Sequence, residues 1–138
     1  MICVIDASVA LSWVYSDEHS AVSNALLARV SQEGAVVPSL WRLEVANSLQ
    51  TGIKRKLIDA AYRDSSIQIF LRLSIEIDLE TNDYAWTTIL QLADMHRLTV
   101  YDAVYLELAL RRSLPLATRD EDLAAAAGSA GVVLLPSR

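Results

Sequence analysis

Residues 1–13 read MICVIDASVALSW, an apolar run broken by one acid. Residues 2–5 form an apolar run typical of a buried strand, and the run ends at Asp6. The acid has two interpretations. Asp6 or Ser8 caps the helix that follows, because short polar side chains accept hydrogen bonds from free backbone N–H groups. Alternatively, Asp6 lies at the carboxyl end of a central parallel strand, where open α/β sheets bind their ligands.

Strand and helix patterns alternate along the rest of the chain. We expect strands at residues 2–6, 35–37, 75–79, 114–118 and 132–135. We expect helices at residues 9–15, 20–32, 39–52, 57–73, 83–96 (capped by Asn82), 99–112 and 121–127. This alternation predicts an α/β fold with a mainly parallel central sheet covered on both faces. The length of 138 residues predicts one domain spanning residues 1–138.

The helical periodicity also predicts which side chains face the core. Leu43 and Leu49 fall on one face of the helix expected at 39–52, and Phe70 and Leu71 are core candidates in the helix expected at 57–73. The three tryptophans are interpreted as core or dimer contacts: Trp13, Trp41 and Trp86.

Composition excludes several classes of protein. The net charge of −5 disfavours a protein that holds duplex DNA by neutralising phosphates, but it is compatible with a nuclease whose acids bind metal ions. The single cysteine, Cys3, rules out a disulfide within the chain and is expected to be a packing residue. We find no membrane-spanning segment and no basic signal region, so we expect a cytoplasmic protein that does not contact membranes.

Four acids follow strands or open helices: Asp6, Glu44, Asp102 and Asp120. Each has an ordinary explanation, because Asp102 completes a capping box that begins at Thr99, Asp120 favours a helix N-terminus and Glu44 fits a solvated helix face. However, the carboxyl ends of parallel strands and the N-termini of the helices after them share one edge of a sheet. We therefore expect Asp6, Glu44 and Asp120 to converge there, and Asp102 to join them if its helix begins at the same edge.

Converging carboxylates repel one another and favour a divalent cation. Oxygen ligands of this kind suit Mg²⁺ or Mn²⁺ better than Zn²⁺. One such ion, or a pair about 3.5–4 Å apart, polarises phosphoryl oxygens and lowers the pKa of bound water, which suits phosphate chemistry.

The motifs that carry these acids also resemble a known family. IDASVALSW with Asp6, PSLWRLEVANSL with Glu44, LTVYDAVYLELAL with Asp102 and LPLATRDEDL with Asp120 occur in the order and spacing of PIN-domain proteins, specifically the VapC-type toxins of prokaryotic toxin–antitoxin pairs. The resemblance runs from residue 2 to beyond residue 120.

The resemblance implies a compact three-layer α/β/α fold and a Mg²⁺- or Mn²⁺-dependent endoribonuclease that acts as the toxin of a type II pair. It implies a homodimer, inhibited by a cognate antitoxin whose tail occupies the active-site groove, with DNA contacted only through that antitoxin. The four acids would form the catalytic metal site. Supporting positions would be Ser8, Asn47, Thr118 and Asp122.

Basic side chains are candidates for guiding the RNA backbone toward the acids. The densest cluster is Lys54, Arg55 and Lys56, for which the alternative is a solvated helix end. Arg119 is the strongest single candidate because it adjoins Asp120.

Two other functions share some of these features. A receiver-type phosphoacceptor module also places acids and Mg²⁺ at a sheet edge, but it needs paired acids after its first strand and a late lysine. Here Asp6 stands alone and no lysine follows Lys56. A non-catalytic PIN-like binding protein is the second alternative, although none of the four expected acids is missing.

Overall fold

The computed structural model describes residues 1–138, with residue 16 described by its backbone only. Within these residues, four strands form one parallel sheet in the order β3-β2-β1-β4. The strands are short: β1 (Val4–Ile5), β2 (Ala35–Pro38), β3 (Ile75–Asp78) and β4 (Leu116–Ala117). The expected α/β fold with a parallel central sheet is therefore confirmed.

Helices fill every connection between the strands. Between β1 and β2 lie α1 (Ala7–Ser12), the 3₁₀ turn η1 (Ser16–Glu18) and α2 (Ala21–Glu33). Between β2 and β3 lie α3 (Trp41–Lys54) and α4 (Ala60–Leu71). The path from β3 to β4 runs through η2 (Thr81–Tyr84), α5 (Thr88–His96) and α6 (Val100–Arg112), and α7 (Glu121–Ser129) follows β4.

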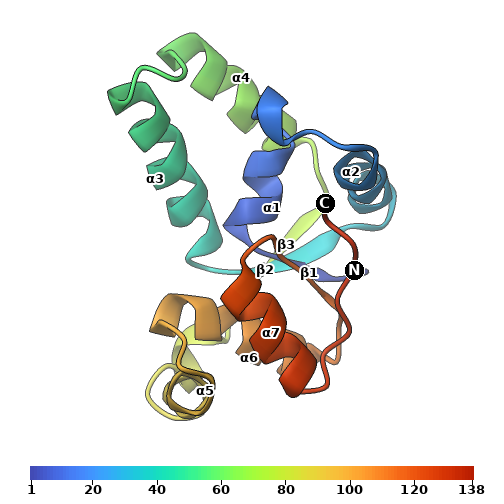
Figure 1. Cartoon of the computed structure of the whole chain (residues 1–138), viewed down its shortest axis with the longest axis vertical. Coiled ribbons are helices and arrows are strands. Elements are labelled where there is room, and N and C mark those ends of the chain that lie inside the picture. Colours follow the sequence, from blue (N-terminus) through green and yellow to red (C-terminus); the bar gives the residue numbers. More distant parts are fainter.

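The order of the strands sorts these helices into two layers. The chain moves outward from β1 to β3 and then returns to the other side of β1 to form β4. Because parallel crossovers are right-handed, this reversal puts the later helices on the opposite face. Figure 1 shows α1 to α4 on one side of the sheet and α5 to α7 on the other. The reversal between β1 and β4 is a topological switch point, the usual position of an α/β ligand site.

The core lies on both faces of the central strands. Val4 and Ile5 of β1 are fully buried, as is Cys3 before them, which explains why the strand is a continuous apolar run. Burial raises the pKa of the Cys3 thiol to about 11, so this thiol is a packing group and not a nucleophile. Helix α6 is the most deeply buried helix, and every residue from 103 to 109 in it is buried.

The helix expected at residues 83–96 begins later than predicted. Asn82 lies inside the 3₁₀ turn η2, and α5 starts only at Thr88. The reason is a tertiary contact, because the Thr81 hydroxyl donates to Asp78 Oδ2 at 2.8 Å and anchors the chain as it leaves β3. A 3₁₀ turn then connects this anchor to the helix.

Other elements also differ from their expected extent. The expected strand at 132–135 is reduced to a single parallel bridge between Leu134 and Leu116 at the sheet edge. Helix α4 begins at Ala60 and not at 57, because Asp59 caps it by accepting the Tyr62 backbone N–H at 2.8 Å.

Two side chains expected in the core are exposed instead. Leu43 is 74% exposed and Leu71 is 60% exposed, whereas Leu49 and Phe70 are buried as predicted. Trp13 and Trp41 lie in the core, and Trp86 is 89% exposed, so a dimer contact stays the prediction for it. Helical periodicity marks an apolar face but does not show how far the neighbouring helix extends over that face.

Candidate active site

Asp6 is the buried centre of the candidate site. It directly follows β1, is 5% exposed and accepts hydrogen bonds on both carboxylate oxygens. The Ser8 hydroxyl donates to Oδ1 at 2.6 Å, the Val9 backbone N–H donates to Oδ1 at 3.1 Å, and the Thr118 hydroxyl donates to Oδ2. Asp6 therefore caps α1 and also lies at the switch point, so both sequence interpretations apply to this residue.

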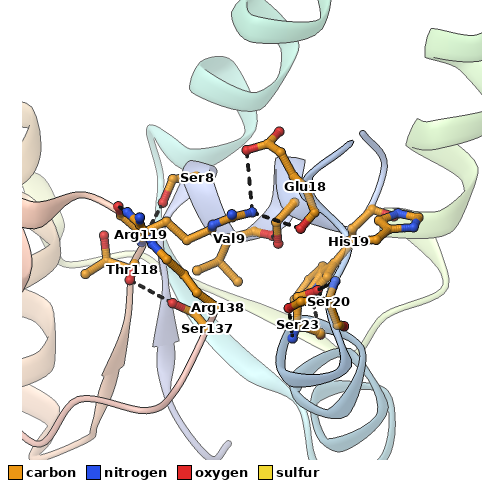
Figure 2. Close-up of polar contacts among 12 residues, drawn as sticks. Ser8, Val9, Glu18, His19, Ser20, Ser23, Thr118, Arg119, Ser137 and Arg138 are labelled. Atoms are coloured by element: carbon orange, nitrogen blue, oxygen red, sulfur yellow. Dashed lines mark hydrogen bonds and ion pairs between the residues drawn. The ribbon is translucent and has the colours of Figure 1, made fainter. Parts of the chain in front are cut away.

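Two hydroxyls connect Asp6 to the turn after β4. Thr118 Oγ1 accepts the Asp120 backbone N–H at 3.0 Å, and Ser8 Oγ accepts the Arg119 backbone N–H at 2.9 Å. The Ser137 hydroxyl donates to the Thr118 carbonyl at 2.8 Å, a contact drawn in Figure 2. These bonds hold the ends of β1 and β4 in a fixed relation across the switch point.

Asp120 lies at the N-terminus of α7. Its Oδ1 accepts the Leu123 backbone N–H at 2.9 Å, so it caps the helix while its carboxylate stays at the same edge as Asp6. Asp122 is exposed in the first turn of α7.

Glu44 and Asp102 come from two other helices. Glu44 lies in the first turn of α3 and is partly buried, and the Tyr105 hydroxyl of α6 donates to its Oε1. Asp102 lies in the first turn of α6, where Thr99 Oγ1 accepts its backbone N–H at 3.1 Å. Helix α3 begins where β2 ends, as the alternation predicted, and the start of α6 lies near the same acids, because the charge of Asp102 acts on Glu44.

The pKa values of three of these acids are raised. Burial is the largest cause for Asp6, Glu44 and Asp102. The negative charges of neighbouring site acids raise the pKa further: Asp120 acts on Asp6, and Asp102 and Asp6 act on Glu44. The pKa of Asp102 is raised by Asp120, Asp6 and Asp122. Each of the four carboxylates thus lies within electrostatic range of at least two of the others.

No basic side chain relieves this repulsion among the described residues. The salt bridges of the arginines go to other acids, such as Glu33, Asp64, Asp78, Glu76 and Glu18, and to none of the four site acids. Mutually repelling carboxylates without a cationic partner are a donor set that fits a hard divalent cation. In the described part of the chain, however, no three His, Cys, Asp or Glu side chains lie close enough together to hold one ion. The residue types fit a metal ion, and the side chains lie near one another without converging on one point.

The remaining predicted residues lie along α3 and at its end. Asn47 is exposed on α3, one turn after Glu44. The cluster of Lys54, Arg55 and Lys56 is exposed at the other end of α3, about 15 Å along the helix from Glu44.

Arg119 is engaged with the 3₁₀ turn η1. Its Nη1 donates to the Glu18 carbonyl at 3.2 Å and lies 3.5 Å from Glu18 Oε1, as Figure 2 shows. Its guanidinium therefore fixes η1 against the turn after β4.

Sequence reasoning missed Tyr105 and Ser137. Tyr105 lies three residues after Asp102, so in a helix the two side chains share one face, and this spacing was the available signal. Ser137 reaches Thr118 only because the terminal segment runs beside β4, which no local pattern indicates.

Comparison with known proteins assigns the family. A PIN domain family model matches residues 3–129, and the chain belongs to this family. PIN domains are typically nucleases and generally use divalent metal ions. The fold is similar to the crystal structure of PAE2754 from Pyrobaculum aerophilum, with a TM-score of 0.72, 21% sequence identity, and coverage of 98% of this chain and 84% of that chain. No curated protein matches the chain.

Proposed function

We propose that this chain is a metal-dependent endoribonuclease that hydrolyses RNA phosphodiester bonds. One observation carries the proposal: carboxylates from four separate elements lie at the switch-point edge of the sheet, burial and then their own charges raise the pKa of three of them, and they have no basic partner in the described residues. Asp6, Glu44, Asp102 and Asp120 are the proposed ligands of Mg²⁺ or Mn²⁺.

The roles of the protein groups follow from their contacts. Ser8 and Thr118 keep the Asp6 carboxylate in one orientation, and Thr118 and the α7 cap keep Asp120 beside it. A bound Mg²⁺ or Mn²⁺ would polarise a phosphoryl oxygen and lower the pKa of water for attack. The four acids would anchor the scissile phosphate indirectly, because an anionic site cannot bind phosphate without a cation.

The proposed biological role is that of the toxin in a type II toxin–antitoxin pair. The motifs around the four acids support this role, as does the family membership. The expected partners are an RNA substrate, a second copy of this chain and a cognate antitoxin, with DNA contacted only through the antitoxin. Expression of the chain alone should arrest bacterial growth, and expression of the Asp6→Asn variant should not.

The enzymatic test is an RNA cleavage assay with purified protein. Cleavage should need Mg²⁺ or Mn²⁺, stop in excess EDTA, and fall by about 100-fold or more in Asp6→Asn. Asp94→Asn is the matched control, because Asp94 is an exposed acid on α5 and its loss should leave the rate unchanged. Full activity in EDTA, or in Asp6→Asn, would overturn the proposal. Cleavage of single-stranded DNA but not RNA would overturn the choice of substrate.

A further inference from the structure

Tyr105 makes a contact that its ring packing does not explain. It is a large, almost fully buried side chain of α6, 2% exposed, and its hydroxyl donates to Glu44 Oε1 on α3. The two residues are 61 positions apart in the chain and belong to helices on opposite faces of the sheet. The hydroxyl therefore joins the two helical layers at the edge that carries the four carboxylates.

A buried phenol needs a hydrogen-bond acceptor, because leaving it unpaired costs free energy. Most side-chain hydrogen bonds in proteins go to backbone groups or to water. Here the acceptor is a carboxylate that belongs to the candidate site and that has no basic partner among the described residues. A hydrogen bond to the charged carboxylate favours its ionised form and restricts its rotamer.

The same helix also supplies Asp102, three residues before Tyr105. Because residues three apart share one face of a helix, α6 presents an acid and a hydroxyl to the site together. The negative charges of Asp102 and Glu44 repel each other, so Tyr105 restrains the carboxylate that α6 itself repels.

We propose that Tyr105 is a positioning residue that holds Glu44 beside Asp6 and Asp102 in the orientation needed for cation binding. This inference rests on the proposed function, because it assumes that the four acids bind a divalent cation.

The test is Mn²⁺ binding measured by calorimetry and by electron paramagnetic resonance of free Mn²⁺. Tyr105→Phe keeps the ring and removes the hydroxyl, and it should weaken Mn²⁺ affinity about 10-fold, as loss of a group that orients a ligand commonly does. Tyr101→Phe is the matched control, because Tyr101 lies on the same helix and is 66% exposed. The Mn²⁺ affinity of the Tyr101→Phe variant should equal that of the wild type.

A double-mutant cycle separates positioning from general structural damage. If Tyr105 acts through Glu44, then Tyr105→Phe should change Mn²⁺ affinity little further in a Glu44→Gln background. Equal, additive losses in both backgrounds would overturn the inference, as would wild-type affinity in folded Tyr105→Phe.

A second measurement covers the case in which Tyr105→Phe does not fold. In protein labelled with fluorotyrosine, Mg²⁺ should shift the fluorine NMR signal of a buried tyrosine in the wild type. The same signal should not shift when Mg²⁺ is added to Glu44→Gln. The same shift in both proteins would contradict the inference. Absence of Mn²⁺ binding by the wild type would overturn both this inference and the proposed metal site, whereas binding by the wild type with no effect of Tyr105→Phe would overturn the inference alone.

Discussion

At the scale of single residues, the hydroxyl of Thr118 is shared between two of the site acids. It donates to Asp6 Oδ2 and accepts the Asp120 backbone N–H at 3.0 Å, and it is 7% exposed. One side chain therefore supplies a hydrogen bond to a buried carboxylate and another to a backbone N–H on the two sides of the switch point.

Replacing Thr118 tests this role with little change of shape. Thr118→Val should lower the free energy of unfolding by about 2–3 kcal/mol, because a buried acceptor and an N–H lose their partner. Thr118→Ser keeps the hydroxyl and should lose about 1 kcal/mol or less from the missing methyl group. Urea denaturation measures both values, and equal stability of Thr118→Val and the wild type would contradict the shared-hydroxyl account.

Asp102 tests the repulsion among the acids. Burial and the charges of Asp120 and Asp6 raise the pKa of Asp102 in the folded state. The folded state therefore loses stability as the pH rises from the pKa of Asp102 in the unfolded chain through its pKa in the folded protein, because Asp102 must ionise at an unfavourable position. Asp102→Asn removes this cost, and at pH 7 without divalent metal its Tm should exceed that of the wild type by about 3 °C. The difference should vanish below about pH 4, near the unfolded pKa.

Divalent metal should reverse that order. Saturating Mn²⁺ stabilises a protein that binds it, by about 2.7 kcal/mol at 100 times the dissociation constant, and the wild type should gain more than Asp102→Asn. An equal gain in both proteins would show that Asp102 is not a ligand. Calorimetric scans with and without Mn²⁺ provide the comparison.

These four acids were predictable because each follows a strand or opens a helix, a relation visible in the sequence. Tyr105 and Ser137 were not predicted, because their partners Glu44 and Thr118 are brought to them by tertiary packing. The candidate metal ligands can be recognised from the sequence around them, whereas the groups that orient these ligands cannot.

At the scale of elements, one arginine ties α6 to the end of β3. Arg111 pairs with Asp78 at 2.7 Å and with Glu107 at 2.9 Å, and its guanidinium lies 4.6 Å from the Tyr84 ring centroid. The side chains of Asp78 and Glu107 are only 2% exposed, so each buried carboxylate relies on Arg111 as its ion-pair partner. This network positions α6, the helix that carries Asp102 and Tyr105.

The network predicts a pH dependence of stability. Although burial raises the pKa of Asp78, the hydrogen bonds from Arg111 and Thr81 outweigh it and lower the pKa below its ordinary value. A lowered folded pKa stabilises the protein above the unfolded pKa, about 4, and that contribution disappears as the pH falls through the folded pKa. The wild type should therefore be more stable than Asp78→Asn at pH 7, with the gap closing below about pH 4.

Chemical denaturation from about pH 3 to pH 7 measures this gap. Glu76→Gln is the matched control, because Glu76 pairs with Arg112 at 2.8 Å while 43% exposed, and such surface pairs contribute about 1 kcal/mol or less. A gap that stays constant over the whole range would contradict the assignment to Asp78.

The element order was predictable from alternation, and several boundaries were not. The helix expected from Asn82 starts at Thr88, because the Thr81–Asp78 contact holds the chain after β3. The strand expected at 132–135 is one bridge, because only Leu134 reaches the register of Leu116. Propensity describes local preference, and tertiary contacts decide where an element begins.

At the scale of the whole molecule, the charge distribution separates acids from bases. The net charge is −5, the four acids lie at the sheet edge and the densest basic cluster lies at the far end of α3. We propose that residues 1–138 form one domain in which RNA contacts both regions. Among the described residues, no helix combines the length and the apolar character needed to cross a membrane.

The basic cluster predicts the salt dependence of RNA binding. Replacing Lys54, Arg55 and Lys56 with alanine should weaken binding of single-stranded RNA and reduce the slope of log K against log salt, by about 0.7 for each phosphate that the cluster neutralises in the wild type. Fluorescence anisotropy in EDTA-free Ca²⁺ buffer measures the slope. An unchanged slope and affinity would exclude the cluster from the RNA path.

We propose that carboxylates from four elements share one divalent cation site. The most direct test of this proposal is a crystal structure of this protein with Mn²⁺, using anomalous scattering to locate the metal. We predict an anomalous peak at the switch-point edge with oxygen ligands from Asp6 and at least one of Glu44, Asp102 and Asp120, and no such peak in Asp6→Asn. Mn²⁺ bound only elsewhere, or absent at saturating concentration, would contradict the account.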